Sequence, residues 1–380
     1  MGWRGGGHML EKGKISASQM GMMLFLAVVA SGVMSIPGIT GKYAHNDLWL
    51  SPIWAALMGT VTVWIAHRLH CMYPEKTSVQ YSEEVVGKVA GKAIGFLFIF
   101  FYLHLSGFVV RSYAEFIVQN FLHKTPISVV IITMIFVCTW AVRAGIEVIG
   151  RTAQLFFPVF LIPVLFIPLL LNNMKLDYLF PMLEHGLVPS IKGALVPGGW
   201  LSEMFLLSFL LPYVRNQEKG KSSALYAVIG VTLLLTMINF FILFVLGKQI
   251  GDFLFPVMVA FRYISVAEFF ENMESLVMAI WILGMFVKIS IFYYVTVLGA
   301  SQWFRMSDYR SLVLPIGFFV GLFSFWSFPN FNTGLYFDIY AFPFYGPLIQ
   351  TVLPLFLLII AALRKKGQSQ NQNLTAAKHK

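Results

Sequence analysis

Charged residues are scarce in this sequence, in which Asp, Glu, Lys and Arg together make up 12% of 380 residues. Soluble domains carry about 25% charged and about 45–50% apolar residues, whereas 58% of this chain is apolar and its mean hydropathy is +0.76. A surface in contact with water cannot be built from such a composition at this length. The composition therefore excludes a soluble enzyme, a nucleic-acid-binding protein and a disordered scaffold, and it predicts an integral membrane protein.

Cysteine is nearly absent, and so are the short motifs of catalysis. The two cysteines, Cys71 and Cys138, are too far apart for a metal or redox motif. The chain contains no G-x-S-x-G, H-E-x-x-H or P-loop pattern. We therefore expect no enzyme activity, no metal site and no bound cofactor.

Long apolar runs fill most of the chain, and ten of them are long enough to cross a bilayer as helices. They cover residues 15–37, 50–72, 93–121, 127–143, 148–171, 194–214, 222–247, 275–300, 311–328 and 338–363. The shorter stretch 254–270, which contains Arg262, is predicted to be interfacial or re-entrant. The fold class that follows is an all-α integral membrane protein with ten transmembrane helices.

Basic residues are distributed unevenly among the loops. With the N-terminus inside, the inner segments hold 19 of the 27 Lys and Arg residues and the outer segments hold 6. Because loops rich in Lys and Arg stay on the cytoplasmic side, both termini are predicted to be cytoplasmic. The net charge of +10 then belongs to a basic face against anionic membrane lipids, and no nucleic-acid partner is expected.

Three regions follow from this topology. Residues 1–14 form a cytoplasmic segment, residues 15–363 form the membrane domain, and residues 364–380 form a basic cytoplasmic tail that we expect to be disordered. The first eight residues leave both Met1 and Met9 open as the start of the working chain.

Ten spans divide into five plus five, and a five-helix unit repeated in tandem inserts its second copy inverted. Inverted-repeat transporters bind substrate where the first helix of each repeat is broken. Span one carries small residues before Pro37-Gly38, and span six carries Gly198 and Gly199 after Pro197. Pro lacks an amide hydrogen and Gly resists helix, so both spans are predicted to be broken, with backbone groups free for a ligand. Alternatively, these residues only kink the helices and let them pack closely.

The residues around these interruptions are candidate ligand-binding residues. They are Ala30, Ser31, Gly32 and Val33 in span one, and Gly198, Gly199, Trp200 and Glu203 in span six.

Two ionisable residues fall near the middle of spans, where a charge is costly and indicates function. Glu203 lies in span six and Lys288 in span eight, at a similar expected depth. An ion pair between them would lower the cost of both charges. Three roles remain open for this pair: a lock between two helices, a titratable proton-coupling site, or direct contact with a ligand.

Several of these features resemble a known family. The small residues around Gly32 with Pro37-Gly38 are similar to the first-helix signature of amino acid, polyamine and organocation transporters. The ten spans, the basic start before Ile15, Glu203 after the span-six glycines, and Leu211-Pro212 at the end of that span resemble the B subunit of endospore germinant receptors. Ala30 stands where these transporters often carry Gly, a departure that favours a receptor over a full transport cycle.

The resemblance implies a nutrient sensor in the inner membrane of a dormant spore. Such a sensor would bind an amino acid or other small germinant in a transporter-like pocket and act with an A subunit and a lipid-anchored C subunit. Some members of the superfamily bind sodium between helices one and eight, and others place a protein amine there, a role that Lys288 could take with Glu203 as its partner. The alternative function is a proton-coupled amino acid transporter.

Span three lines the pocket in related transporters, so its polar residues are further candidates. Tyr102, Ser106 and Val109 recur near helical spacing and share one face, which makes them candidate ligand contacts. Arg111 and Glu115 are four residues apart on one face, as in an intrahelical salt bridge, and the sharper alternative is an outer gate. An aromatic cluster from Phe323 to Tyr345 is predicted to be an interfacial belt.

Overall fold

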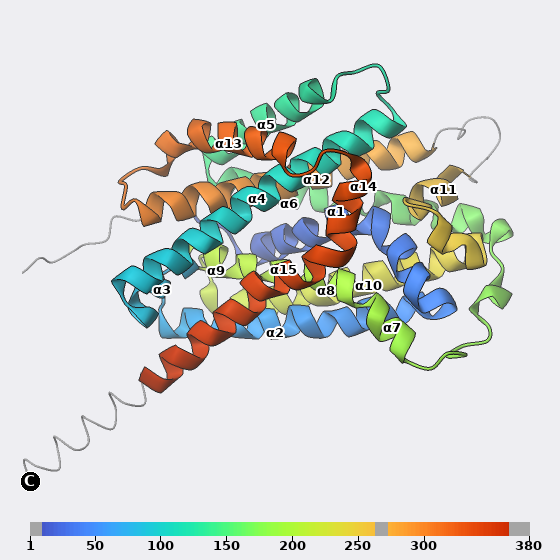
Figure 1. Cartoon of the computed structure of the whole chain (residues 1–380), viewed down its shortest axis with the longest axis horizontal. Coiled ribbons are helices and arrows are strands. Elements are labelled where there is room, and N and C mark those ends of the chain that lie inside the picture. The colour runs from blue at the N-terminus through green and yellow to red at the C-terminus, as the bar shows by residue number, and fades with distance from the viewer. Residues whose placement is uncertain (1–9, 263–272, 365–380) are drawn as a thin grey trace, which may run out of the picture.

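The computed structural model describes residues 10–262 and 273–364 of the chain. Regular structure in these two ranges is helical, and the long helices lie side by side in one bundle (Figure 1). One isolated β-bridge, between Ile15 and Val214, is the exception.

The first half of the chain supplies five of the predicted spans. Its elements are α1 (Ala17–Ala44), η1 (His45–Leu50), α2 (Ser51–Met72), α3 (Ser78–Val86), α4 (Lys88–Asn120), α5 (Ile127–Ala144), α6 (Ile146–Phe160), η2 (Ile162–Asn173) and η3 (Leu176–Leu179).

The second half is more irregular. Its elements are α7 (Val188–Gly193), α8 (Leu195–Leu201), η4 (Ser202–Leu206), α9 (Leu207–Leu210), η5 (Leu211–Tyr213), η6 (Gln217–Lys219), α10 (Gly220–Leu246), η7 (Gly247–Asp252), α11 (Pro256–Arg262), α12 (Met273–Trp303), η8 (Tyr309–Leu312), α13 (Val313–Trp326), α14 (Phe331–Tyr336), η9 (Phe337–Ala341), α15 (Phe342–Pro347) and η10 (Leu348–Val352).

Nine segments of the described chain are long and apolar enough to cross a membrane. The first of them, Ala17–Met72, is 56 residues long and contains both α1 and α2. Each of the ten predicted spans coincides with part of one of the nine, to within two residues at its ends. Part of the predicted interfacial segment 254–270 forms α11, and the rest lies outside the described residues. The leader before Leu10 and the tail after Arg364 also lie outside them.

The packing of helices follows the predicted five-plus-five repeat. Helix α1 packs on α6 and α10, and the corresponding helix of the second half, α8, packs on α15 and α2. Corresponding spans also pair directly, as α2 with α10, α4 with α12, and α5 with α13. Matching neighbours of this kind are what an inverted repeat produces, and they bring α1, span six and α12 together in the bundle.

Span six is interrupted as predicted. The α-helix ends at Leu201, the 3₁₀ segment η4 carries Glu203, and a second 3₁₀ segment, η5, follows the short α9. A Cβ atom added at Gly199 would lie 3.2 Å from Pro343 Cα, so α8 approaches the backbone of α15 closely at this point.

Span one differs from the prediction, because α1 is a single helix from Ala17 to Ala44 with Pro37 inside it. One proline removes only one amide donor, and the packing of α6, α10 and α12 around the helix holds it together despite its glycines. Side chains still bond to the α1 backbone: Trp281 Nε1 donates to the Ala30 carbonyl, and Thr40 Oγ1 donates to the Ile36 carbonyl at 2.8 Å.

Residues 10–16, which we call the N-terminal strap, close the end of the bundle where α1 begins. The Glu11 carboxylate is 4% exposed and accepts hydrogen bonds from the Gly13 amide (2.7 Å), the Ile146 amide (3.2 Å) and the Tyr294 hydroxyl (3.3 Å). Ile15 pairs through its backbone with Tyr213 and Arg215 at the end of span six. The strap therefore ties α1 to α6, α12 and span six.

Span ten contains two π-helical segments, η9 and η10, separated by α15. Each holds one polar residue of functional interest, Asp338 in η9 and Gln350 in η10. Single π turns within α-helices occur frequently at functional sites.

Candidate functional site

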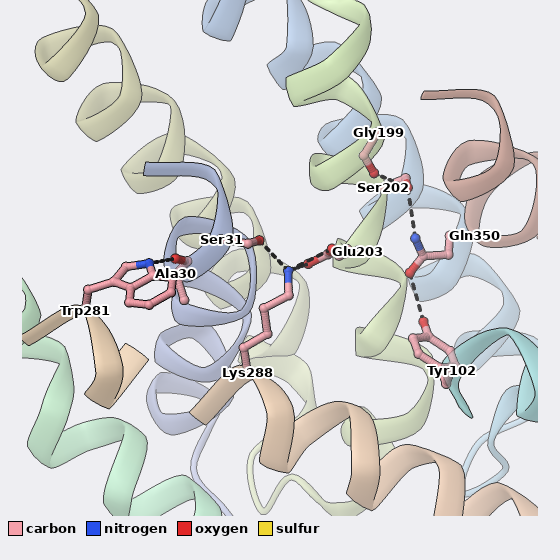
Figure 2. A network of polar contacts seen from close by, with 9 residues as sticks. All are labelled: Ala30, Ser31, Tyr102, Gly199, Ser202, Glu203, Trp281, Lys288 and Gln350. Atoms are coloured by element: carbon pink, nitrogen blue, oxygen red, sulfur yellow. Dashed lines mark hydrogen bonds and ion pairs between the residues drawn. The ribbon is translucent and has the colours of Figure 1, made fainter. Parts of the chain in front are cut away.

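The predicted ion pair between Glu203 and Lys288 is confirmed. Lys288 Nζ lies 2.9 Å from Glu203 Oε1 and 2.8 Å from Oε2, and it donates to Ser31 Oγ at 2.7 Å (Figure 2). The Lys288 side chain is fully buried and that of Glu203 is 2% exposed. The pair thus joins α1, span six and α12 at one point inside the bundle.

The Lys288 ammonium group has polar partners on two sides. Its Nζ contacts both oxygens of the Glu203 carboxylate, and it donates to the Ser31 hydroxyl. The group also lies 5.0 Å from the centre of the Phe292 ring. These protein groups offset part of the cost of burying the charge.

A cavity of about 80 Å³ lies beside this pair. Five residues predicted to form the site line it, namely Ser31, Val109, Trp200, Glu203 and Lys288. A water molecule occupies about 30 Å³ of liquid and ligand pockets usually span about 300–1,000 Å³. The cavity therefore has room for a few waters or a very small ligand, and a larger ligand requires the helices to separate.

A larger hollow of about 830 Å³ lies between α5 and α13 and is lined almost entirely by apolar side chains. None of the predicted site residues lines it. The hollow lies between two helices of low burial, and Glu203 and Lys288 line the other cavity.

Three predicted residues of span one lie next to the cavity and not in its wall. The Ala30 carbonyl accepts the Trp281 indole hydrogen bond. A Cβ atom at Gly32 would lie 2.7 Å from Ile36 Cδ1 and in ordinary van der Waals contact with the Trp200 ring at 3.6 Å, so Gly32 lies beside Trp200. Val33 faces a separate apolar cavity of about 40 Å³.

A second polar network runs from span three to span six (Figure 2). The Tyr102 hydroxyl donates to Gln350 Oε1 at 3.0 Å, Gln350 Nε2 donates to Ser202 Oγ at 3.0 Å, and Ser202 Oγ donates to the Gly199 carbonyl at 2.6 Å. Ser106 donates to the Tyr102 carbonyl of its own helix at 2.6 Å. This network holds the interrupted region of span six from the side away from Lys288.

Gly198 is buried, and a Cβ built there would make only an ordinary contact, with Met58 Cβ at 3.9 Å. Arg111 and Glu115 form the predicted intrahelical salt bridge, with Nη2 and Oε1 2.7 Å apart and side chains 11% and 12% exposed. The Arg111 guanidinium lies 5.5 Å from the Phe328 ring, which lines the cavity. The pair is therefore placed at the edge of the cavity.

Sequence reasoning missed Asp338, Trp281 and Gln350. Asp338 is the one acidic residue of the apolar segment 331–364, so the rule that indicated Glu203 and Lys288 also applies to it. The aromatic residues around Asp338 concealed it, because the cluster Phe323–Tyr345 was predicted to lie at the membrane interface. Trp326 is exposed, whereas Phe328 and Phe342 are 2% exposed and line the cavity.

The sequence of this chain is similar to those of several known proteins. A family model described as "Spore germination protein" matches residues 14–332. Spore germination protein KB of Bacillus subtilis (strain 168) is 27% identical, with 97% of this chain and 100% of the relative covered. Spore germination protein YndE of the same organism is 25% identical over 93% and 98%, and GerQB of Bacillus cereus is 23% identical over 78% and 82%.

Two solved structures share the fold at low identity. One is Mhp1, a nucleobase-cation-symport-1 family transporter in a closed conformation with bromovinylhydantoin bound, with a TM-score of 0.68, 13% identity, and 93% of this chain and 79% of that chain covered. The other is MhsT in complex with L-phenylalanine, with a TM-score of 0.60, 16% identity, and 89% of both chains covered. The family model matches most of the length of this chain, and the helix packing and the buried ion pair agree with that match. The chain belongs to the spore germination protein family.

Proposed function

We propose that this chain is the membrane subunit of a nutrient germinant receptor, which binds a small germinant in the cavity beside Lys288 and thereby triggers spore germination. An amino acid is the germinant class that we propose. Membership of the spore germination protein family supports the receptor role, and the transporter fold supports a binding site inside the bundle.

The observation that carries this proposal is the position of the Ser31–Lys288–Glu203 contact in the cavity wall. These residues belong to α1, α12 and span six, the elements that a bound ligand would touch together. A ligand entering the cavity alters the contacts between these three elements, and their relative movement is the signal that a receptor could pass on.

The proposed partners and location follow from the family and the charge pattern. We propose A and C receptor subunits as protein partners, the spore inner membrane as the location, and cytoplasmic positions for both termini. The excess of Lys and Arg in the predicted inner segments supports this orientation.

The second candidate function is proton-coupled amino acid transport. It is favoured by the fold shared with Mhp1 and MhsT, of which MhsT holds L-phenylalanine. The small cavity and the strap that closes one end of the bundle fit a resting receptor equally well.

The test is equilibrium binding of radiolabelled amino acids to the purified chain, beside uptake of the same compounds by proteoliposomes. We expect binding without gradient-driven accumulation, and we expect spores lacking the gene to lose their response to the same compound. Accumulation driven by a proton gradient would establish transport instead, and absence of both activities for every amino acid would refute amino acid recognition.

A further inference from the structure

Asp338 stands out among the residues that line the cavity. It lies in the π-helical segment η9 of span ten and faces the same cavity as Glu203 and Lys288. Within residues 10–262 and 273–364, no hydrogen bond or ion pair engages its carboxylate. It is therefore an ionisable group at the cavity that interacts with Lys288 only at longer range and has no direct hydrogen-bond or salt-bridge partner among the described residues.

The Asp338 carboxylate changes the balance of charge around the cavity. Lys288 lies 2.8 Å from Glu203 and also attracts Asp338 electrostatically. Two carboxylates therefore share one ammonium group, and when both are ionised the residues that line the cavity carry one negative charge in excess. An isolated carboxylate in an apolar environment is strongly unfavourable unless a cation or a proton neutralises it.

The remaining walls of the cavity suit an organic cation. Aromatic side chains, among them Trp281, Phe331 and Phe342, surround the space, and a cation is attracted to the face of an aromatic ring. The hydroxyl groups of Ser35 and Ser112 also line the cavity and can accept hydrogen bonds from an ammonium group.

From these contacts we infer that Asp338 binds the ammonium group of the germinant, so that the receptor selects small primary amines, as free cations or as the amino end of an amino acid, over sugars and nucleosides. This inference rests on the proposed function and names the ligand group that the site recognises. The volume of about 80 Å³ further restricts binding without helix movement to the smallest amines.

The test uses the full-length chain in lipid nanodiscs and isothermal titration with four probes. L-Alanine and L-alaninamide carry the ammonium group, N-acetyl-L-alanine has lost it, and glucose is neutral. We expect the unsubstituted protein to bind the first two and to reject the other two. A charge-assisted hydrogen bond is worth about 1.5–3 kcal/mol, so Asp338→Asn should weaken binding of both amines by about 10- to 100-fold.

Matched variants separate charge from shape. Asp338→Glu keeps the negative charge and should restore part of the affinity, whereas Asp252→Asn, which removes an exposed carboxylate in η7 outside the cavity, should leave it unchanged. If Asp338→Asn does not fold, Asp338→Glu tests the role of Asp338, because moving the carboxylate should change the affinity for both amines, and an unchanged affinity would overturn the inference.

The outcomes distinguish this inference from the proposed function. Failure of the unsubstituted protein to bind any probe would count against amino acid binding itself. Equal binding of L-alanine and N-acetyl-L-alanine, or an unchanged affinity in Asp338→Asn, would overturn the role of Asp338 and leave the receptor proposal standing. Displacement of L-alanine by potassium or sodium ions at equal concentration would assign the carboxylate to inorganic cations and also overturn it.

Discussion

At the scale of single residues, the buried charges dominate the energetics of the site. Lys288 and Glu203 are each nearly inaccessible, and their attraction is balanced by the cost of removing both from water. The net stabilisation from such a pair can be small, but the loss of one partner leaves the other charge uncompensated.

Lys288→Met should therefore destabilise the protein by about 3–5 kcal/mol, because Glu203 would remain buried without its counter-ion. The double variant Lys288→Met/Glu203→Leu should recover most of this loss, since it removes both charges. Thermal unfolding in detergent, arranged as a double-mutant cycle, measures the coupling. Additive effects of the two substitutions would show that the pair contributes no stability.

Lys288→Met also tests whether the Glu203–Lys288 pair takes part in proton exchange or only locks two helices together. If Lys288 or Glu203 exchanges a proton during function, the germination response of Lys288→Met spores should depend on pH differently from that of unsubstituted spores. An unchanged pH profile would leave the lock between helices as the role of the pair.

At the scale of elements, close contacts between helices determine how the helices of the bundle can move relative to one another. Gly199 and Gly198 are neighbours in α8 with different surroundings. A Cβ atom built at Gly199 would lie 3.2 Å from Pro343 Cα in α15, whereas one built at Gly198 would lie 3.9 Å from Met58 Cβ. The N-terminal strap is a second such contact, because Glu11 connects three separate elements.

Gly199→Leu should abolish the germinant response while the protein still reaches the membrane, because the side chain would push α8 away from Pro343 and Phe342. Gly199→Ala should have a weaker effect in the same direction, and Gly198→Ala should have none. Ligand binding and membrane protein level report the two properties separately. A normal response in Gly199→Leu at a normal protein level would separate this helix contact from function.

Glu11→Ala should destabilise the protein by about 1–3 kcal/mol, because the amide of Ile146 and the hydroxyl of Tyr294 lose their acceptor. It should also speed hydrogen exchange at the first turns of α1 and α6. Glu218→Gln, at an exposed position of η6, is the control. If exchange is unaltered in Glu11→Ala, the strap does not hold this end of the bundle closed.

At the scale of the whole molecule, orientation in the membrane is testable with the two native cysteines. Cys71 is exposed near the end of α2, and Cys138 is fully buried in α5. With both termini cytoplasmic, a membrane-impermeant maleimide should label Cys71 in inside-out vesicles and leave right-side-out vesicles unlabelled. Labelling in the opposite vesicles would invert the proposed topology.

The length of the apolar runs predicted the helices of the fold well, because a helix must be long and apolar to span a bilayer. The distribution of Lys and Arg among the loops predicted how the helices are oriented. The rule that charges within a span are costly also predicted the partnership of Glu203 and Lys288. The continuity of α1 was not predictable from Pro37 and Gly32, since the packing of distant helices decided it. Gln350 was missed for a related reason, as an amide in an apolar span gains meaning only from Tyr102 and Ser202.

The two π-helical segments of span ten give this helix a mechanical property. Each π turn contains one residue more than an α-helical turn, and one residue corresponds to about 100° of rotation in an α-helix. A change from π to α in η9 would therefore rotate the following part of the helix about its own axis. Such a rotation would move Gln350 away from Tyr102 and Ser202. Ligand binding at Asp338 would then change the contacts that hold span six.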